Sequence, residues 1–283
     1  MSAFKQIMPL LPERYASQFR MEDFTGLEEI RMGCGRPVRL RYRVGERELL
    51  PYAERSDVEE VLQRACQRSM YAYENTITQG YVTVAGGHRI GLCGTGVFCH
   101  QTLQNMKEPS SVNIRIAREC MGFANEAIKQ LRSSALLLGP PGCGKTTLLR
   151  DLIRQLSDHR RQNIGLADER GELSATEGGK PQLHIGIRTD VLVHVPKGQA
   201  MMMLLRTMSP HWIAVDEITS PKDIEAMEEI SYCGVHLLAT AHGSSINDLK
   251  NRPLYQRLMD KKLFDQVILI KKDKSYTVEE LFI

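Results

Sequence analysis

The sequence predicts an α/β core with a mostly parallel sheet and helices on both of its faces, preceded by a smaller α+β domain. From Ser133 onward, short apolar runs alternate with segments whose apolar residues recur at helical spacing, and this alternation is typical of βαβ units. At 283 residues the chain has room for two domains. We expect an N-terminal domain over residues 1–110, a linker strand and helix over 111–132, and the core over 133–283. The expected core strands are Ala135–Leu138, Ile164–Ala167, Ile213–Val215, Leu237–Ala239 and Val267–Ile270.

Three patterns define the expected N-terminal domain. Apolar residues alternate with arginines from Val38 to Val44, which predicts a half-buried strand. Asp57–Met70 carries apolar residues at helical spacing, and Gly80–Val97 is rich in Gly, Val and Thr and predicts hairpin strands. Lys107–Ser111, which contains Pro109, is the expected linker.

A phosphate-binding motif opens the core. Residues 139–146 read GPPGCGKT, which matches G-x-x-x-x-G-K-[ST] and lies between a predicted strand and an amphipathic helix. Its glycines let backbone N–H groups surround phosphates, and the helix N-terminus adds a positive dipole end. Lys145 is expected to reach the β- and γ-phosphates and Thr146 to ligate Mg²⁺. The expected nucleotide contacts are Gly139, Pro140, Pro141, Gly142, Cys143, Gly144, Lys145, Thr146 and Thr147.

The flanking strand and helix argue against the alternative, a chance glycine-rich turn. The sequence therefore predicts a RecA-like P-loop nucleotide hydrolase that binds ATP with Mg²⁺.

A second strand of the core ends in two carboxylates. HWIAVDEI, residues 211–218, is an apolar strand that runs into Asp216 and Glu217. Asp216 is the expected Mg²⁺ ligand, and Glu217 the residue that orients the attacking water. The alternative is an acidic helix N-terminus, but burial of charge directly after an apolar run disfavours it.

Two further strands end in polar residues. Ile164–Ala167 is followed by Asp168, a further metal ligand, and Glu169, a further catalytic carboxylate. Leu237–Ala239 is followed by His242, which either senses the γ-phosphate and its water or is an ordinary structural histidine. Because ligands of open α/β sheets bind beyond the carboxyl ends of the strands, these groups and the P-loop are expected at one edge.

Arginines have several interpretations in this chain. Arg206 and Arg188 lie between the acidic strands and either neutralise transition-state charge, in cis or from a neighbouring subunit, or are surface residues; Arg206 is the expected catalytic one. The segment Arg36–Arg47 is a solvated strand face, a contact for anionic lipid or nucleic acid, or a contact for a neighbour's nucleotide. The net charge of +3 does not favour nucleic acid.

Composition favours a cytoplasmic protein. The seven cysteines contain no C-x-x-C pair, which favours reduced thiols over disulfides or a zinc site. No segment reaches the ~20 apolar residues of a membrane span, and the N-terminus lacks the pattern of a signal peptide. We expect any membrane attachment to depend on partner proteins.

The order of motifs resembles the secretion ATPases of type II and type IV systems and the pilus retraction motors. The P-loop, an acidic box at Ala167–Leu173, S-P-x-x-I-x-V-D-E and a histidine box at Ala239–Gly243 carry this resemblance. Those motors usually have Gly-Glu at the position of Asp216–Glu217, and they continue into a longer C-terminal helical region. In them the N-terminal domain contributes arginines, and Arg115 and Arg118 occupy the matching segment; a plain strand is the alternative.

The sequence is more similar still to the stage III sporulation AA family of endospore-forming bacteria. ADERGELS, RTDVL, the methionine-rich segment before Met208–Pro210, and VDEI match it, as do EIRMGCGRPV, GYVTVAGGHRIGLCG and NIRIARE. The resemblance implies a mother-cell ATPase that forms a ring, expected to be a hexamer. Its implied partners are the membrane proteins of the stage III A channel complex.

A RecA-like nucleic-acid translocase is the alternative that shares the core. A small-molecule kinase would need an arginine-rich lid, and none is evident.

Overall fold

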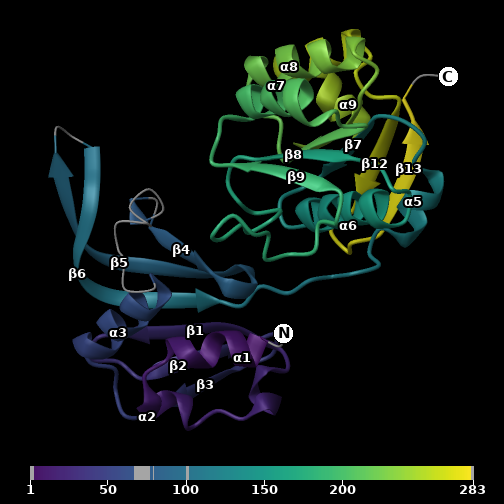
Figure 1. The fold of residues 1–283 in the computed structure, drawn as a ribbon. Helices are drawn as coiled ribbons and strands as arrows, with labels where there is room; N and C mark the ends of the chain where they lie inside the picture. Colours follow the sequence, from purple (N-terminus) through teal and green to yellow (C-terminus); the bar gives the residue numbers. More distant parts are fainter. Residues whose placement is uncertain (1–2, 67–76, 79, 100–101, 282–283) are drawn as a thin grey trace. The chain divides into compact units, whose positions relative to one another are not determined.

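The computed structural model describes residues 3–66, 77–78, 80–99 and 102–281. It divides into two compact units (Figure 1). The first contains Met1–Arg118 together with Glu177–Gln182, and the second contains Glu119–Thr176 and Leu183–Ile283. The short segment belongs to the first unit although it lies far along the chain, and the side-chain oxygen of Gln182 accepts a hydrogen bond from the Gly86 amide at 3.1 Å.

The first unit is built on a six-stranded antiparallel sheet in the order β3-β2-β1-β6-β5-β4. Its strands are β1 (Leu27–Gly33), β2 (Val38–Tyr42), β3 (Glu46–Leu49), β4 (Tyr81–Val84), β5 (His88–Cys99) and β6 (Thr102–Arg115). The predicted alternating strand is β2, and the predicted hairpin is β4 with β5. Strands β5 and β6 extend past their neighbours as a long bent pair (Figure 1).

One face of this sheet is buried. Leu40, Ile30, Ile114 and Ile90 lie opposite one another across four strands and are fully buried. Helices α1 (Ala3–Ile7), α2 (Glu13–Ala16) and α3 (Arg55–Ala65) supply further residues of the same core, among them Ile7, Tyr15 and Val58. The alternation of apolar and polar residues thus gives a sheet with one covered face.

The structure differs from two predictions for the N-terminal domain, the bounds of its helix and the position of its linker. The helix expected over Asp57–Met70 begins at Arg55, where Glu54 and Asp57 cap it, and residues 67–70 lie outside the described residues. The linker expected at Lys107–Ser111 is wrong, because these residues belong to β6 and pair with β5 and β1. Pro109 fits there because the register shifts between Cys93 and Thr95, at a bulge where a strand tolerates proline.

The second unit is built on a seven-stranded sheet in the order β13-β12-β7-β11-β10-β8-β9. All neighbours are parallel except β13, which pairs antiparallel with β12. The strands are β7 (Ala135–Gly139), β8 (Ile164–Asp168), β9 (Thr189–Val193), β10 (Trp212–Val215), β11 (His236–His242), β12 (Gln266–Ile270) and β13 (Tyr276–Glu280). The five predicted core strands are therefore all present.

Helices cover both faces of the second sheet (Figure 1). They are α5 (Asn125–Gln130), α6 (Lys145–Asp158), α7 (Lys197–Met208), α8 (Pro221–Tyr232), α9 (Ile246–Lys250) and α10 (Pro253–Asp260). Alternate strand residues enter two separate cores, so that Leu137 packs with α6 whereas Leu136 and Leu138 pack with α7 and α8. This confirms the predicted α/β core preceded by an α+β domain.

None of the helices in the described part of the chain combines the length and apolarity needed to cross a bilayer.

Candidate nucleotide site

A hollow of about 380 Å³ lies at the carboxyl edge of the second sheet. Strands β7, β11, β10 and β8 are adjacent and parallel, so their carboxyl ends meet there. The lining residues come from the loops that follow them: Pro141, Gly142, Gly144, Lys145, Thr146, Thr147, Ala167, Asp168, Glu169, Arg170, Glu172, Lys197, Asp216, Glu217, Thr240 and His242. The predicted convergence of polar groups on one sheet edge is thus present.

The loop after β7 has the backbone that its glycines predict. Gly142 and Gly144 have φ values of 74° and 104°, in the left-handed region that L side chains rarely adopt. Gly144 directly precedes α6, so the helix N-terminus opens into the hollow. Gly139, Pro140 and Cys143 are expected nucleotide contacts that do not line it, and the Cys143 side chain packs in the core.

Lys145 is held by the loop itself. Its Nζ donates to the carbonyl oxygens of Gly139 and Pro140 at 2.9 and 3.0 Å, and lies 3.0 Å from Nδ1 of His242. Burial lowers the pKa of Lys145, while Cys143, Asp216 and Glu217 act in the opposite direction. The ammonium group therefore already has partners that an incoming anion must replace.

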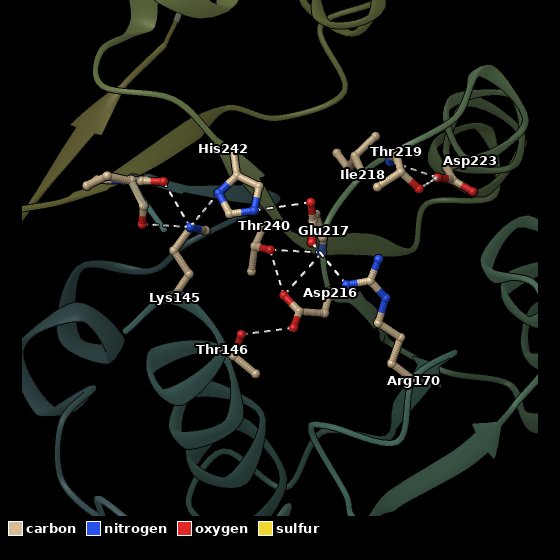
Figure 2. A network of polar contacts seen from close by, with 12 residues as sticks. Lys145, Thr146, Arg170, Asp216, Glu217, Ile218, Thr219, Asp223, Thr240 and His242 are labelled. Carbon is tan, nitrogen blue, oxygen red and sulfur yellow. Dashed lines mark hydrogen bonds and ion pairs between the residues drawn. The ribbon is translucent and has the colours of Figure 1, made fainter. Parts of the chain in front are cut away.

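His242 joins Lys145 to Glu217 (Figure 2). Because an ammonium group only donates, Nδ1 must accept from Lys145, and the other ring nitrogen then carries the proton. That nitrogen, Nε2, lies 3.1 Å from Oε1 of Glu217. His242 therefore links Lys145 to the end of the acidic strand, and its role at a γ-phosphate stays a prediction.

Asp216 is held by two hydroxyl groups. Thr146 Oγ1 donates to its Oδ2 at 2.9 Å, and Thr240 Oγ1 donates to its Oδ1 at 2.6 Å (Figure 2). Mg²⁺ is usually held by one or two carboxylates together with water and substrate phosphates. The carboxylate of Asp216 beside the hydroxyl of Thr146 fits that requirement. Among the described residues, no cluster of three or more His, Cys, Asp or Glu could hold a metal by itself.

Glu217 has a backbone conformation that is rare for a non-glycine residue. Its φ is 41°, and its amide donates to Thr240 Oγ1 at 2.8 Å and to Asp216 Oδ1 at 3.1 Å. The side chain carboxylate also lies 3.6 Å from the guanidinium of Arg170. Such strain persists only where surrounding contacts impose it, and it often occurs at functional sites.

Asp168 is placed differently from the expectation of a metal ligand. The carboxylate is 2% exposed and accepts from the amides of Glu172, Leu173 and Ser174, at 2.9, 3.2 and 2.8 Å, and from Ser174 Oγ at 2.6 Å. Both oxygens are thus occupied by the loop that follows β8. This geometry assigns Asp168 to holding the loop rather than a cation.

Lys197 is a site residue that the sequence analysis missed. It starts α7, its side chain is 7% exposed, and it lines the hollow. Its Nζ contacts Glu169 Oε2 and Thr219 Oγ1, both at 3.2 Å. No motif identifies it, since a lysine at a helix start is ordinarily a surface residue. Glu169 itself is on the rim, with a side chain 41% exposed.

The structure does not bring Arg206 to the site. Helix α7 connects two parallel strands, so its last turn, with Arg206, lies at the amino edge of the sheet and lines a separate hollow with Tyr232. Arg188 is exposed just before β9. Arg118 donates to the carbonyls of Phe24 and Leu27 within the first unit, which favours its interpretation as part of a plain strand connection.

Solved structures with a similar fold include an ATPase and a pilus retraction motor. The ATPase DotB of Legionella pneumophila aligns with a TM-score of 0.56 at 14% identity, over 89% of this chain and 75% of its own. The pilus retraction motor PilT with bound ADP aligns with a TM-score of 0.59 at 15% identity, over 86% and 74%. The chain thus shares its fold with these two proteins.

Sequence comparison gives the family. The family described as sporulation stage III, protein AA matches residues 5–281. The stage III sporulation protein AA of Bacillus subtilis (strain 168) is 36% identical over 292 aligned positions, which cover 100% of this chain and 95% of that protein. A second relative, SEEDLING PLASTID DEVELOPMENT 1 of Arabidopsis thaliana, is 34% identical over 51% of this chain and only 22% of its own length. This chain belongs to the sporulation stage III protein AA family.

Proposed function

We propose that this chain hydrolyses ATP to ADP and phosphate, and that it acts as a hexameric ring that drives a membrane-associated channel complex during endospore formation. The observation that carries the hydrolytic part is the continuous contact from Lys145 through His242 to Glu217, beside the Asp216–Thr146 pair. Family membership and the fold of the motors support the rest. The proposed location is the mother-cell cytoplasm, at the membrane through the stage III A channel proteins.

Each residue has a proposed task. Lys145 exchanges its bonds to the carbonyls of Gly139 and Pro140 for phosphate oxygens, and the backbone amides of the glycine loop complete the cradle. Asp216 and Thr146 hold Mg²⁺, which neutralises charge on the phosphates when bound.

Glu217 orients the attacking water and accepts its proton. His242 positions Glu217 through Nε2. Its Nδ1 contact with Lys145 couples the position of that lysine to the position of Glu217.

Two substitutions separate binding from chemistry. Lys145→Ala should weaken ATP binding, because it removes the cation that the loop presents. Glu217→Gln should retain ATP binding and lower turnover by ~10²-fold or more, the usual contribution of a general base. Binding of a fluorescent ATP analogue and release of phosphate measure the two quantities.

The matched control is Glu225→Gln, which removes a carboxylate that pairs with Arg257 on α10 and is remote from the hollow. It should change neither binding nor turnover. Equal loss of ATP binding in Lys145→Ala and Glu217→Gln would contradict the task given to Glu217.

Ring formation has a separate test. Activity per subunit should rise with protein concentration as rings assemble, in parallel with the mass measured by light scattering. A protein that stays monomeric with ATP, at constant activity per subunit, would leave the hydrolase proposal intact and remove the ring.

A further inference from the structure

The solvent face of the first sheet carries a row of polar residues across four strands. Arg39, Arg31, Asn113 and Gly91 lie opposite one another on β2, β1, β6 and β5. Residues in register on neighbouring strands share a face, and the adjacent row of buried isoleucines and leucine occupies the other face. Arg39 and Arg41, two arginines of the segment whose role the sequence left open, therefore lie on this outer face.

A hollow of about 360 Å³ is sunk into this face. Gly91 leaves it open, because a Cβ there would meet nothing nearer than the Asn113 carbonyl oxygen at 3.9 Å. At Gly33 a Cβ would come within 2.7 Å of the Arg36 guanidinium, which therefore lies directly over this glycine. Arg31, Arg36 and Arg39 line the hollow, and no described lining residue is acidic.

One arginine of the hollow and several arginines outside it have acidic partners. Glu29 lies 2.9 Å from Arg31, 3.7 Å from Arg41 and 3.9 Å from Arg115. The other arginines of the segment pair elsewhere, Arg43 with Glu28 and Arg47 with Asp23.

Arg36 and Arg39 differ from these arginines. Within residues 3–66, 77–78, 80–99 and 102–281 neither forms an ion pair, although Glu48 lies opposite Arg39 in register. In addition, Oδ1 of Asn113 is buried and has no hydrogen-bond partner in this part of the chain. The hollow thus presents two guanidinium groups without counter-ions and one acceptor that needs a donor.

We propose that this hollow binds an acidic segment of a partner protein. Guanidinium groups pair with carboxylates through two parallel hydrogen bonds, which suits Asp or Glu side chains on Arg36 and Arg39. A peptide also supplies N–H donors, and one of these satisfies Asn113. A fully ionised phosphate group supplies only acceptors, so it leaves the amide oxygen of Asn113 unpaired.

The test measures binding of a fluorescently labelled hexaglutamate peptide to the full chain by anisotropy. Binding should saturate, and Arg36→Ala or Arg39→Ala should weaken it by about 10-fold each, the effect of losing one charge-assisted pair. Arg43→Ala is the matched control, because it removes the same charge from the same segment outside the hollow and should change binding by less than about 2-fold.

A second variant tests the shape of the site. Gly91→Val leaves every arginine in place and suits a strand, and its Cβ meets nothing nearer than 3.9 Å, but its side chain occupies part of the hollow. Binding should fall by about as much as in Arg36→Ala.

Three results would overturn the proposal. The first is absence of saturable binding at millimolar peptide, and the second is an unchanged affinity in Gly91→Val, which would indicate general attraction to a positive face. The third is displacement of the peptide by inorganic phosphate or an oligonucleotide at lower concentration than by unlabelled peptide, which would assign the hollow to phosphates. The circular dichroism spectrum and the urea unfolding curve of each variant, compared with those of the wild type, check that the first unit is folded.

Discussion

Replacement of Asp168 by asparagine distinguishes a residue that holds a loop from one that holds a metal. In the structure the carboxylate accepts four hydrogen bonds from Glu172, Leu173 and Ser174. Asparagine keeps one acceptor oxygen for the first two amides, but its NH₂ group faces the Ser174 amide, donor against donor. One buried N–H is left unpaired and the charge assistance is lost, a cost of about 2–4 kcal/mol in unfolding free energy.

The chain offers a direct probe of that loss. Trp212 is the single tryptophan, and it is buried in β10 of the second unit, so its fluorescence reports the unfolding of that unit. At about 2–4 °C per kcal/mol for a domain of this size, Asp168→Asn should lower the melting temperature by roughly 5–15 °C. The Mg²⁺ concentration that gives half-maximal ATP hydrolysis should stay unchanged.

Glu169→Gln is the matched control, since it alters the neighbouring carboxylate, which is 41% exposed on the rim of the same hollow. Its melting temperature should move by no more than about 2 °C. The reasoning is refuted if Asp168→Asn has the melting temperature of the wild type but needs more Mg²⁺ for half-maximal ATP hydrolysis, because that is the behaviour of a metal ligand.

Further predictions concern three other features. Burial lowers the pKa of His88 to about 4, so between pH 6.5 and 4 this histidine binds a proton in the unfolded chain but not in the folded one. The free energy of unfolding should therefore fall by up to about 3 kcal/mol as the pH drops through this window. In His88→Gln the free energy of unfolding, measured by urea denaturation with circular dichroism, should depend less on pH. Thr240→Val removes the hydroxyl that holds Asp216 and the Glu217 amide, and phosphate release should fall roughly 10- to 100-fold with ATP binding retained; unchanged turnover would contradict the positioning. Filter binding should find no salt-dependent affinity for DNA or RNA, because most arginines of the Arg36–Arg47 segment are paired; a steep salt slope would revive the translocase alternative.

The core strands could be predicted because each is buried on both faces and therefore reads as a continuous apolar run. Strands β9 and β13 lie at the sheet edges and lack such runs, as in Tyr276–Glu280, so local sequence carries little signal for them. The convergence of Asp216, Glu217 and His242 followed from the rule that parallel strands share one carboxyl edge.

The remaining site residues depend on information that is not local. Four contacts from a folded loop decide the task of Asp168, and the burial of Lys197 depends on Glu169 and Thr219 across the hollow. The position of Arg206 away from the site, in contrast, follows from the connection rule for parallel strands. A helix between parallel strands runs back toward their amino ends, so its last turn cannot lie at the carboxyl edge of the same sheet.

The segment Glu177–Gln182 belongs to the first unit, although the residues before and after it belong to the second. Asp168 holds the backbone at Ser174, and the segment that belongs to the first unit begins three residues later, at Glu177. The same backbone returns at Leu183 toward β9. Force applied to Glu177–Gln182 therefore passes along the backbone through Thr176 to Ser174, whereas the contacts that hold this segment in the first unit, among them the hydrogen bond from Gly86 to Gln182, are non-covalent.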